Sequence, residues 1–90
     1  MDEIFEIFFD NITGSAKRIE STSFHCVWKV EVASKFIIIH ESYVSAERYS
    51  LEDHSPDVNR AKALEQMPII MWQIHQIIMA KRPRPPKRFK

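Results

Sequence analysis

His25 and Cys26 are adjacent in the sequence, and a thiol beside an imidazole is a combination used in nucleophilic catalysis. Both lie in FHCVWKVEV, residues 24–32, where two sets of residues alternate with the period of two that is typical of a half-buried strand. Neighbours on a strand point to opposite faces, so these two side chains cannot pair as nucleophile and base. Cys26 falls among the apolar positions, and we predict a core thiol.

The densest polar cluster is Glu52-Asp53-His54 with Asp57. Metal ligands must converge on one point, and a consecutive run ahead of a helix seldom does so. We therefore expect a solvated loop whose acids suit the positive end of a helix. With a single glycine, the chain also has no loop that could cradle phosphates. The sequence predicts a protein that is not an enzyme and that holds no metal and no cofactor.

The chain ends in KRPRPPKRFK, residues 81–90, in which six residues are cationic and none is acidic. All 12 acidic residues precede this segment together with seven of the 13 basic ones, so the body carries about −5 and the tail +6. Cations on an extended prolyl segment can follow phosphates and release counterions. The tail is predicted to bind nucleic acid or an acidic protein surface through Lys81, Arg82, Arg84, Lys87, Arg88 and Lys90.

Two other interpretations of the tail stay open. Residues 83–88 match the pattern of two spaced prolines and a basic residue that SH3-type grooves bind. Alternatively, the tail is solvated, or it lies against the acidic body of its own chain.

The elements that carry these residues are predicted from periodicity. Residues 24–32 and 36–44 are both β-prone and should form a hairpin, with a loop of two or three residues. Ser55-Pro56-Asp57 has the features of a helix start, and Pro68 should kink that helix or divide it into two. Residues 4–12 fit either a helix or a strand, and we favour the helix, ended by Gly14. Residues 15–23 are left as loop or strand.

Together these elements predict an α+β fold: a small antiparallel β-hairpin or three-stranded meander packed against a kinked C-terminal helix. Residues 1–82 should form one compact domain, and residues 83–90 a basic, proline-rich tail. The element order resembles that of the double-stranded-RNA-binding domain, but the closing helix lacks the basic N-terminal face that this module uses on phosphates. Composition is that of a soluble globular protein, 44% hydrophobic and 28% charged. A single cysteine and an acidic N-terminus without a leader favour the cytoplasm.

The segment MPIIMWQIHQIIMA, residues 67–80, is too apolar for a helix that covers one sheet. Ile70, Ile74, Ile77 and Ile78 share one face, whereas Trp72 and Met79 lie well round from it. Fourteen residues interrupted by glutamines and a histidine are too few to span a bilayer, so we expect no membrane partner. Either a second element covers the remaining apolar surface, or that surface meets a second copy or a fixed protein partner. The predicted interface residues are Met71, Trp72, His75 and Met79.

These observations predict a small binding module that acts as a regulatory or accessory factor, with its basic arm on nucleic acid or a nucleic-acid-handling complex. The alternative is a protein-directed inhibitor or adaptor, for example a virus-encoded small protein that blocks a host enzyme. That function would use the apolar helix and the acidic body.

Overall fold

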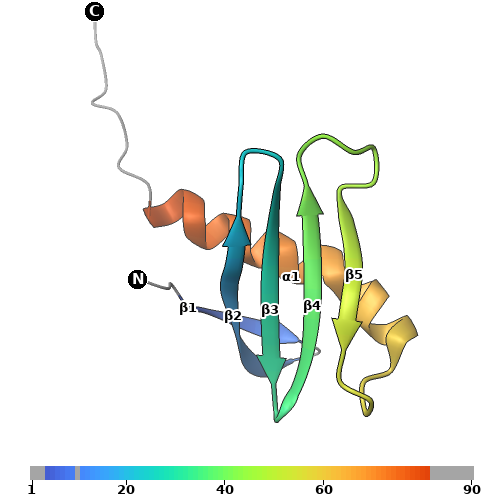
Figure 1. The fold of residues 1–90 in the computed structure, drawn as a ribbon. Helices are drawn as coiled ribbons and strands as arrows, with labels where there is room; N and C mark the ends of the chain where they lie inside the picture. Colours follow the sequence, from blue (N-terminus) through green and yellow to red (C-terminus); the bar gives the residue numbers. More distant parts are fainter. Residues whose placement is uncertain (1–3, 10, 82–90) are drawn as a thin grey trace, which may run out of the picture.

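A computed structural model describes residues 4–9 and 11–81. In this part of the chain, five strands form one antiparallel sheet in sequential order, and one helix crosses one face of it (Figure 1). The elements are β1 Ile4–Phe9, β2 Ile12–Ser21, β3 His25–Val32, β4 Lys35–Ser42, β5 Tyr49–His54 and α1 Arg60–Lys81. The α+β class and the packing of an antiparallel sheet on a C-terminal helix are confirmed. The sheet has five strands, however, where a hairpin or a three-stranded meander was expected. The predicted tail lies outside the described residues.

The N-terminal segment is a strand, so the preference for a helix was wrong. Phe5 and Ile7 point toward α1 and are buried, while Ile4 and Phe8 on the other face are exposed. Pairing with β2 decides the matter, because Ile7 lies opposite Gly14 inside the ladder. Gly14 does not end an element: a Cβ at this position would overlap the Val32 side chain and lie 2.6 Å from the Glu31 carbonyl oxygen. Glycine is therefore what lets β2 approach β3 here.

The expected hairpin joins β3 and β4 through the two-residue turn Ala33-Ser34. Both residues have positive φ, 50° and 71°, as a type I′ turn requires. The resulting register pairs Val32 with Lys35 and Cys26 with Glu41. Because side chains alternate along a strand, this register turns Cys26 toward the helix. The inward set on these two strands is Cys26, Trp28, Val30, Ile37, Ile39 and Glu41.

The helix begins later than expected and is continuous. Asn59, not Ser55, caps it: the Lys62 N–H donates to Asn59 Oδ1 at 3.1 Å. Ser55 instead joins the sheet, where its Oγ accepts from the Phe36 N–H at 3.1 Å. Pro68 lies inside a single 22-residue helix, so the chain forms neither two helices nor the predicted kinked one. Pro68 is exposed, so the Leu64 carbonyl that loses its helical donor lies on the solvent side.

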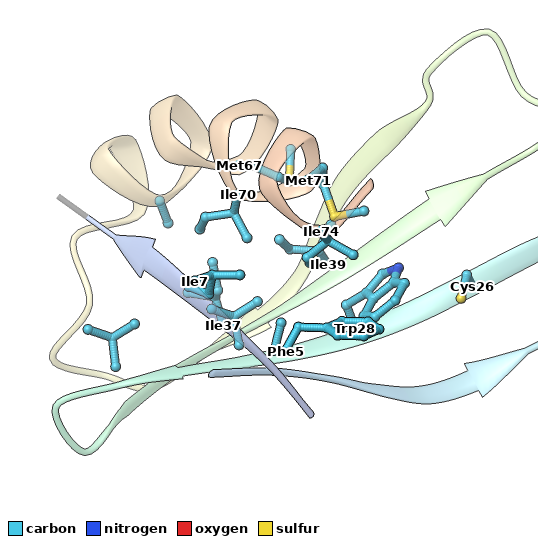
Figure 2. Packing of buried hydrophobic residues seen from close by; sticks show 14 residues of the cluster. Phe5, Ile7, Cys26, Trp28, Ile37, Ile39, Met67, Ile70, Met71 and Ile74 are labelled. Carbon is cyan, nitrogen blue, oxygen red and sulfur yellow. The ribbon is translucent and has the colours of Figure 1, made fainter. Parts of the chain in front are cut away.

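The hydrophobic core fills the layer between the sheet and α1 (Figure 2). The Phe5 and Trp28 rings pack with centroids 5.7 Å apart, and Ile70, Met71 and Ile74 cover them from the helix. Among residues 4–9 and 11–81, no element lies over the opposite face of the sheet (Figure 1). The described part of the molecule therefore has two layers, with a single hydrophobic core between them.

Candidate functional site

Gln73 ties the helix to the edge strand β1. The Phe8 N–H donates to Gln73 Oε1 at 2.7 Å, and Gln73 Nε2 donates to the Phe8 carbonyl oxygen at 2.8 Å. A free sheet edge presents unpaired backbone N–H and carbonyl groups. Here the amide of one side chain, Gln73, bonds to both groups of Phe8. The polar group of this glutamine is therefore used to bond the helix to the sheet.

His75 ties the same helix to β4. Its Nε2–H donates to Glu41 Oε2 at 2.7 Å, and the other oxygen, Glu41 Oε1, accepts from Trp28 Nε1–H at 3.2 Å. The Glu41 side chain is 0% exposed and that of His75 is 34% exposed. A carboxylate in an apolar layer is tolerated only when it is paired, and both oxygens have a donor here. The pair fixes the rotation of α1 about its axis.

Two further polar residues lie near Glu41 or near its hydrogen-bond donor Trp28. Tyr43 follows β4, close to Glu41 and Cys26, and the Arg18 guanidinium lies 5.1 Å from the centre of the Trp28 ring. Desolvation of the hydroxyl, then the negative charge of Glu41 and the contact with Cys26, raise the pKa of Tyr43 to about 12. Cys26 is 1% exposed, as expected for a core thiol. Within this cluster, the hydrogen bonds of Glu41 to His75 and Trp28 hold the helix to the sheet.

The opposite face of α1 is apolar and exposed. Leu64, Ile69, Trp72 and Met79 have 41%, 50%, 64% and 62% of their surface accessible. Together with Ala61, Glu65, Pro68 and Gln76, they form a stripe along the helix that we call the outer face. Glu65 is the one charged member of this set. A helix on the surface of a domain ordinarily carries charged residues on its outward face, with the apolar residues turned inward.

The predicted interface residues divide between the two faces. Trp72 and Met79 lie on the outer face. Met71 is 0% exposed and packs against the sheet, and His75 is turned toward Glu41. Sequence reasoning missed Glu41, although its alternation with Ile37 and Ile39 places it inward once the hairpin register is known.

The predicted tail residues Arg82, Arg84, Lys87, Arg88 and Lys90 lie outside the described part of the chain, and Lys81 is the last residue of α1.

The polar cluster after β4 has local partners. Asp53 Oδ1 accepts from the His54 N–H at 2.8 Å, and His54 Nδ1–H donates to the Ser55 carbonyl oxygen at 2.9 Å. Within residues 4–9 and 11–81, no three ligands of the metal-binding types converge. Glu52, Asp53 and His54 lie in β5, Tyr49–His54, rather than in the expected loop. Their alternation is weak, and pairing with β4 orders them.

The open face of the sheet carries a second set of titratable groups. His25 Nε2–H donates to Glu20 Oε2 at 2.7 Å, and the His25 ring stacks on His40 with centroids 5.0 Å apart. Lys17 and Lys29 lie directly opposite each other, but Glu6 and Glu31 occupy the adjacent row of the same face. Charges of both signs therefore alternate here, and the face does not form a cationic surface.

A hollow of about 250 Å³ lies near the N-terminal end of α1, between the start of this helix and the β1–β2 and β3–β4 turns. Apolar side chains form most of it, including Phe9, Val32, Phe36 and Val58, with Asp57 and Lys62 among the polar ones. It has room for a side chain or a small apolar molecule.

Comparison with protein-family models, with curated proteins and with solved structures finds no match to this chain. In the part of the chain that the structure describes, no helix is both long enough and apolar enough to cross a membrane. The described residues form a two-layer α+β domain whose helix has an apolar outer face.

Proposed function

We propose that this chain is a small, non-enzymatic binding module, a regulatory or accessory factor that docks onto a protein surface through the outer face of α1. One observation carries the proposal. In residues 67–80, polar Gln73 and His75 bond inward to the sheet, while Trp72 and Met79 are more than 60% exposed. An exposed cluster of large apolar side chains marks a contact surface. Tryptophan is also the residue type most enriched among those that dominate binding energies.

The basic C-terminal segment supplies a second contact in this proposal, with nucleic acid or a nucleic-acid-handling complex as the target. The charge division supports it, because the tail carries +6 and the body about −5. Such a segment gains affinity from released counterions, whereas the body repels phosphates. Contact with nucleic acid is thereby confined to the tail.

Binding to oligonucleotides tests this part of the proposal. Affinity for single-stranded DNA is measured across a salt series for the full chain and for Arg84→Gln/Lys87→Gln/Arg88→Gln. If the three cations contact phosphates, the slope of log affinity against log salt becomes shallower by about 2 in the variant. A chain ending at Arg82 should bind more weakly still.

No binding at low salt, or identical slopes, contradicts the nucleic-acid target. The alternative is a protein-directed inhibitor or adaptor that uses the outer face of α1 and the acidic body. That function requires the outer face and leaves the tail dispensable.

An apolar dye such as ANS tests the outer face without knowledge of the partner. A docking surface that is free in the monomer binds the dye, and Trp72→Glu abolishes that binding. Phe24→Glu is a matched control, because Phe24 is 63% exposed, close to the 64% of Trp72, and lies in the β2–β3 turn. Dye binding by a monomer that does not depend on Trp72 contradicts the proposed surface.

A further inference from the structure

We infer that the protein surface that docks on the outer face of α1 is a second copy of this chain, packed with the two helices antiparallel about a two-fold axis near residue 70. This inference rests on the proposed function and names its partner. Trp72, Pro68 and Ile69 lie around the middle of the 22-residue helix. A contact centred there pairs each stripe with itself in reverse, as an isologous interface requires.

The reversed pairing brings large side chains against small ones. With the axis near residue 70, Trp72 of one copy lies opposite Pro68 of the other, and Met79 lies opposite Ala61. Helices pack closely when the ridge of one fits the groove of the other, so this alternation of size allows close contact. The exposed Trp72 and Met79 project from the helix, and each packs against a smaller residue of the other copy.

The same pairing also supplies a hydrogen-bond donor for the Leu64 carbonyl oxygen. Pro68 has no N–H, so the Leu64 carbonyl oxygen lacks its helical donor. A carbonyl left unpaired in an apolar contact is costly. The reversed pairing places Gln76 of the second copy opposite Leu64. Gln76 is exposed and carries no charge, and its amide can donate to that oxygen.

Charge favours the antiparallel arrangement over the parallel one. A parallel pair would set Glu65 against Glu65 across an apolar contact, which is unfavourable. In the antiparallel pair the two Glu65 residues are ten positions apart, or roughly 15 Å at 1.5 Å per residue. Each then lies opposite position 75 of the other copy, next to the uncharged Gln76. No other charge occurs between Glu65 and Lys81.

The size of the surface indicates a reversible dimer. Its four large apolar side chains expose on the order of 500 Å² per copy, so a dimer buries roughly 1,000 Å² of apolar surface. Specific interfaces begin near about 1,000–1,200 Å². We therefore expect association in the micromolar range, with both open sheet faces directed away from the contact.

Disulfide trapping tests the arrangement in the full-length protein. Ala61→Cys and Met79→Cys chains are mixed and mildly oxidised; the native Cys26 is buried and does not compete. The mixture should form a cross-linked dimer containing one chain of each kind. Either variant alone should not, because its two cysteines would lie eighteen positions apart, roughly 27 Å along the helices.

Sedimentation or light scattering tests the association itself. The full chain should dimerise at tens of micromolar, and Trp72→Glu should weaken the dimer at least tenfold, with circular dichroism confirming that the variant is folded. Phe24→Glu should associate like the unmodified chain. Loss of association in both variants, or in neither, contradicts the contact.

The outcomes separate this inference from the proposed function. A strict monomer at these concentrations overturns the second copy, whereas Trp72-dependent dye binding by that monomer leaves a different protein as the partner. A monomer without such dye binding overturns both. A dimer that cross-links within a single variant keeps the surface and overturns the antiparallel arrangement.

Discussion

Both faces of α1 are largely apolar, whereas most surface helices have an apolar inner face and a charged outer one. The inner face contains Gln73 and His75, each hydrogen-bonded to the sheet, among core residues such as Ile74. The outer face exposes Trp72 and Met79. Gln73 and His75 turn inward because β1 and β4 offer them partners, while Trp72 and Met79 are left outward without a described partner. The comparison teaches that a polar side chain can lie on the mostly apolar inner face where a strand supplies it with a hydrogen-bond partner.

The inner face also orients the outer one. Gln73 bonds to β1 at one edge of the sheet, and His75 bonds to β4 across the interior. Two tethers on separate strands restrict both the rotation and the crossing direction of the helix. Trp72, adjacent to Gln73 and three positions before His75, is thereby directed away from the sheet.

The strongest way to break the inner face is to remove the partner of a buried charge. His75→Ala should lower the free energy of unfolding by about 3 kcal/mol, because Glu41 is left unpaired in the apolar layer. Urea unfolding measures the loss. In a Glu41→Gln background, the amide keeps an acceptor for Trp28 and carries no charge, so the same substitution should cost only about 1 kcal/mol. Equal losses in the two backgrounds would show that the contact with the Glu41 carboxylate is not the source.

A matched pair of isoleucines compares the two faces directly. Ile74 is 0% exposed and Ile69 is 50% exposed, and both lie on α1. Ile74→Ala should cost about 3 kcal/mol through lost burial and a residual cavity, while Ile69→Ala should cost less than about 1 kcal/mol. Both are measured by urea unfolding at low protein concentration. Similar costs for the two would contradict the assignment of the faces.

The two glutamines give a second matched pair. Gln73→Ala removes two hydrogen bonds to Phe8 and should cost about 1–2 kcal/mol, with faster amide hydrogen exchange along β1. Gln76→Ala removes an exposed side chain and should leave the exchange of β1 unchanged. Unaltered exchange in the Gln73 variant would mean that the edge strand is held without this amide.

The smallest expected effect is the alkaline titration of Tyr43. Its pKa is raised from 10.0 to about 12, so the folded state retains the proton that the unfolded chain releases. The stabilisation is complete below pH 10 and is lost as the pH rises from 10 toward 12. Absorbance of the tyrosinate in the folded protein should show one late titration, which Tyr43→Phe removes. A late titration that persists in Tyr43→Phe would contradict its assignment to Tyr43.

Local pattern predicted some elements well. The alternation in residues 24–32 and the β-prone run 36–44 indicated β3 and β4, and the wheel of residues 67–80 separated Trp72 and Met79 from the isoleucine face. The N-terminal segment was mistaken because Ile4, Phe5, Phe8 and Phe9 satisfy both periods. β5 was missed because YSLEDH has little alternation, and its order comes from pairing with β4.

The pairing of Glu41 with His75 joins residues 34 positions apart, and no local pattern contains it. The same holds for Gln73 and Phe8, which are 65 positions apart. Both contacts exist because the sheet brings β1 and β4 under one helix, so neither partner could be chosen from its own neighbourhood in the chain.

The order of the amino acids by itself determined the apolar content of the helix, the strand periodicity of the hairpin and the gathering of cations at the C-terminus, because these depend only on neighbours along the chain. Tertiary structure decided which side of α1 faces outward and which polar groups are satisfied. Those outcomes depend on partners brought together from distant positions, and the two-residue turn at Ala33-Ser34 sets the register that turns Glu41 toward His75.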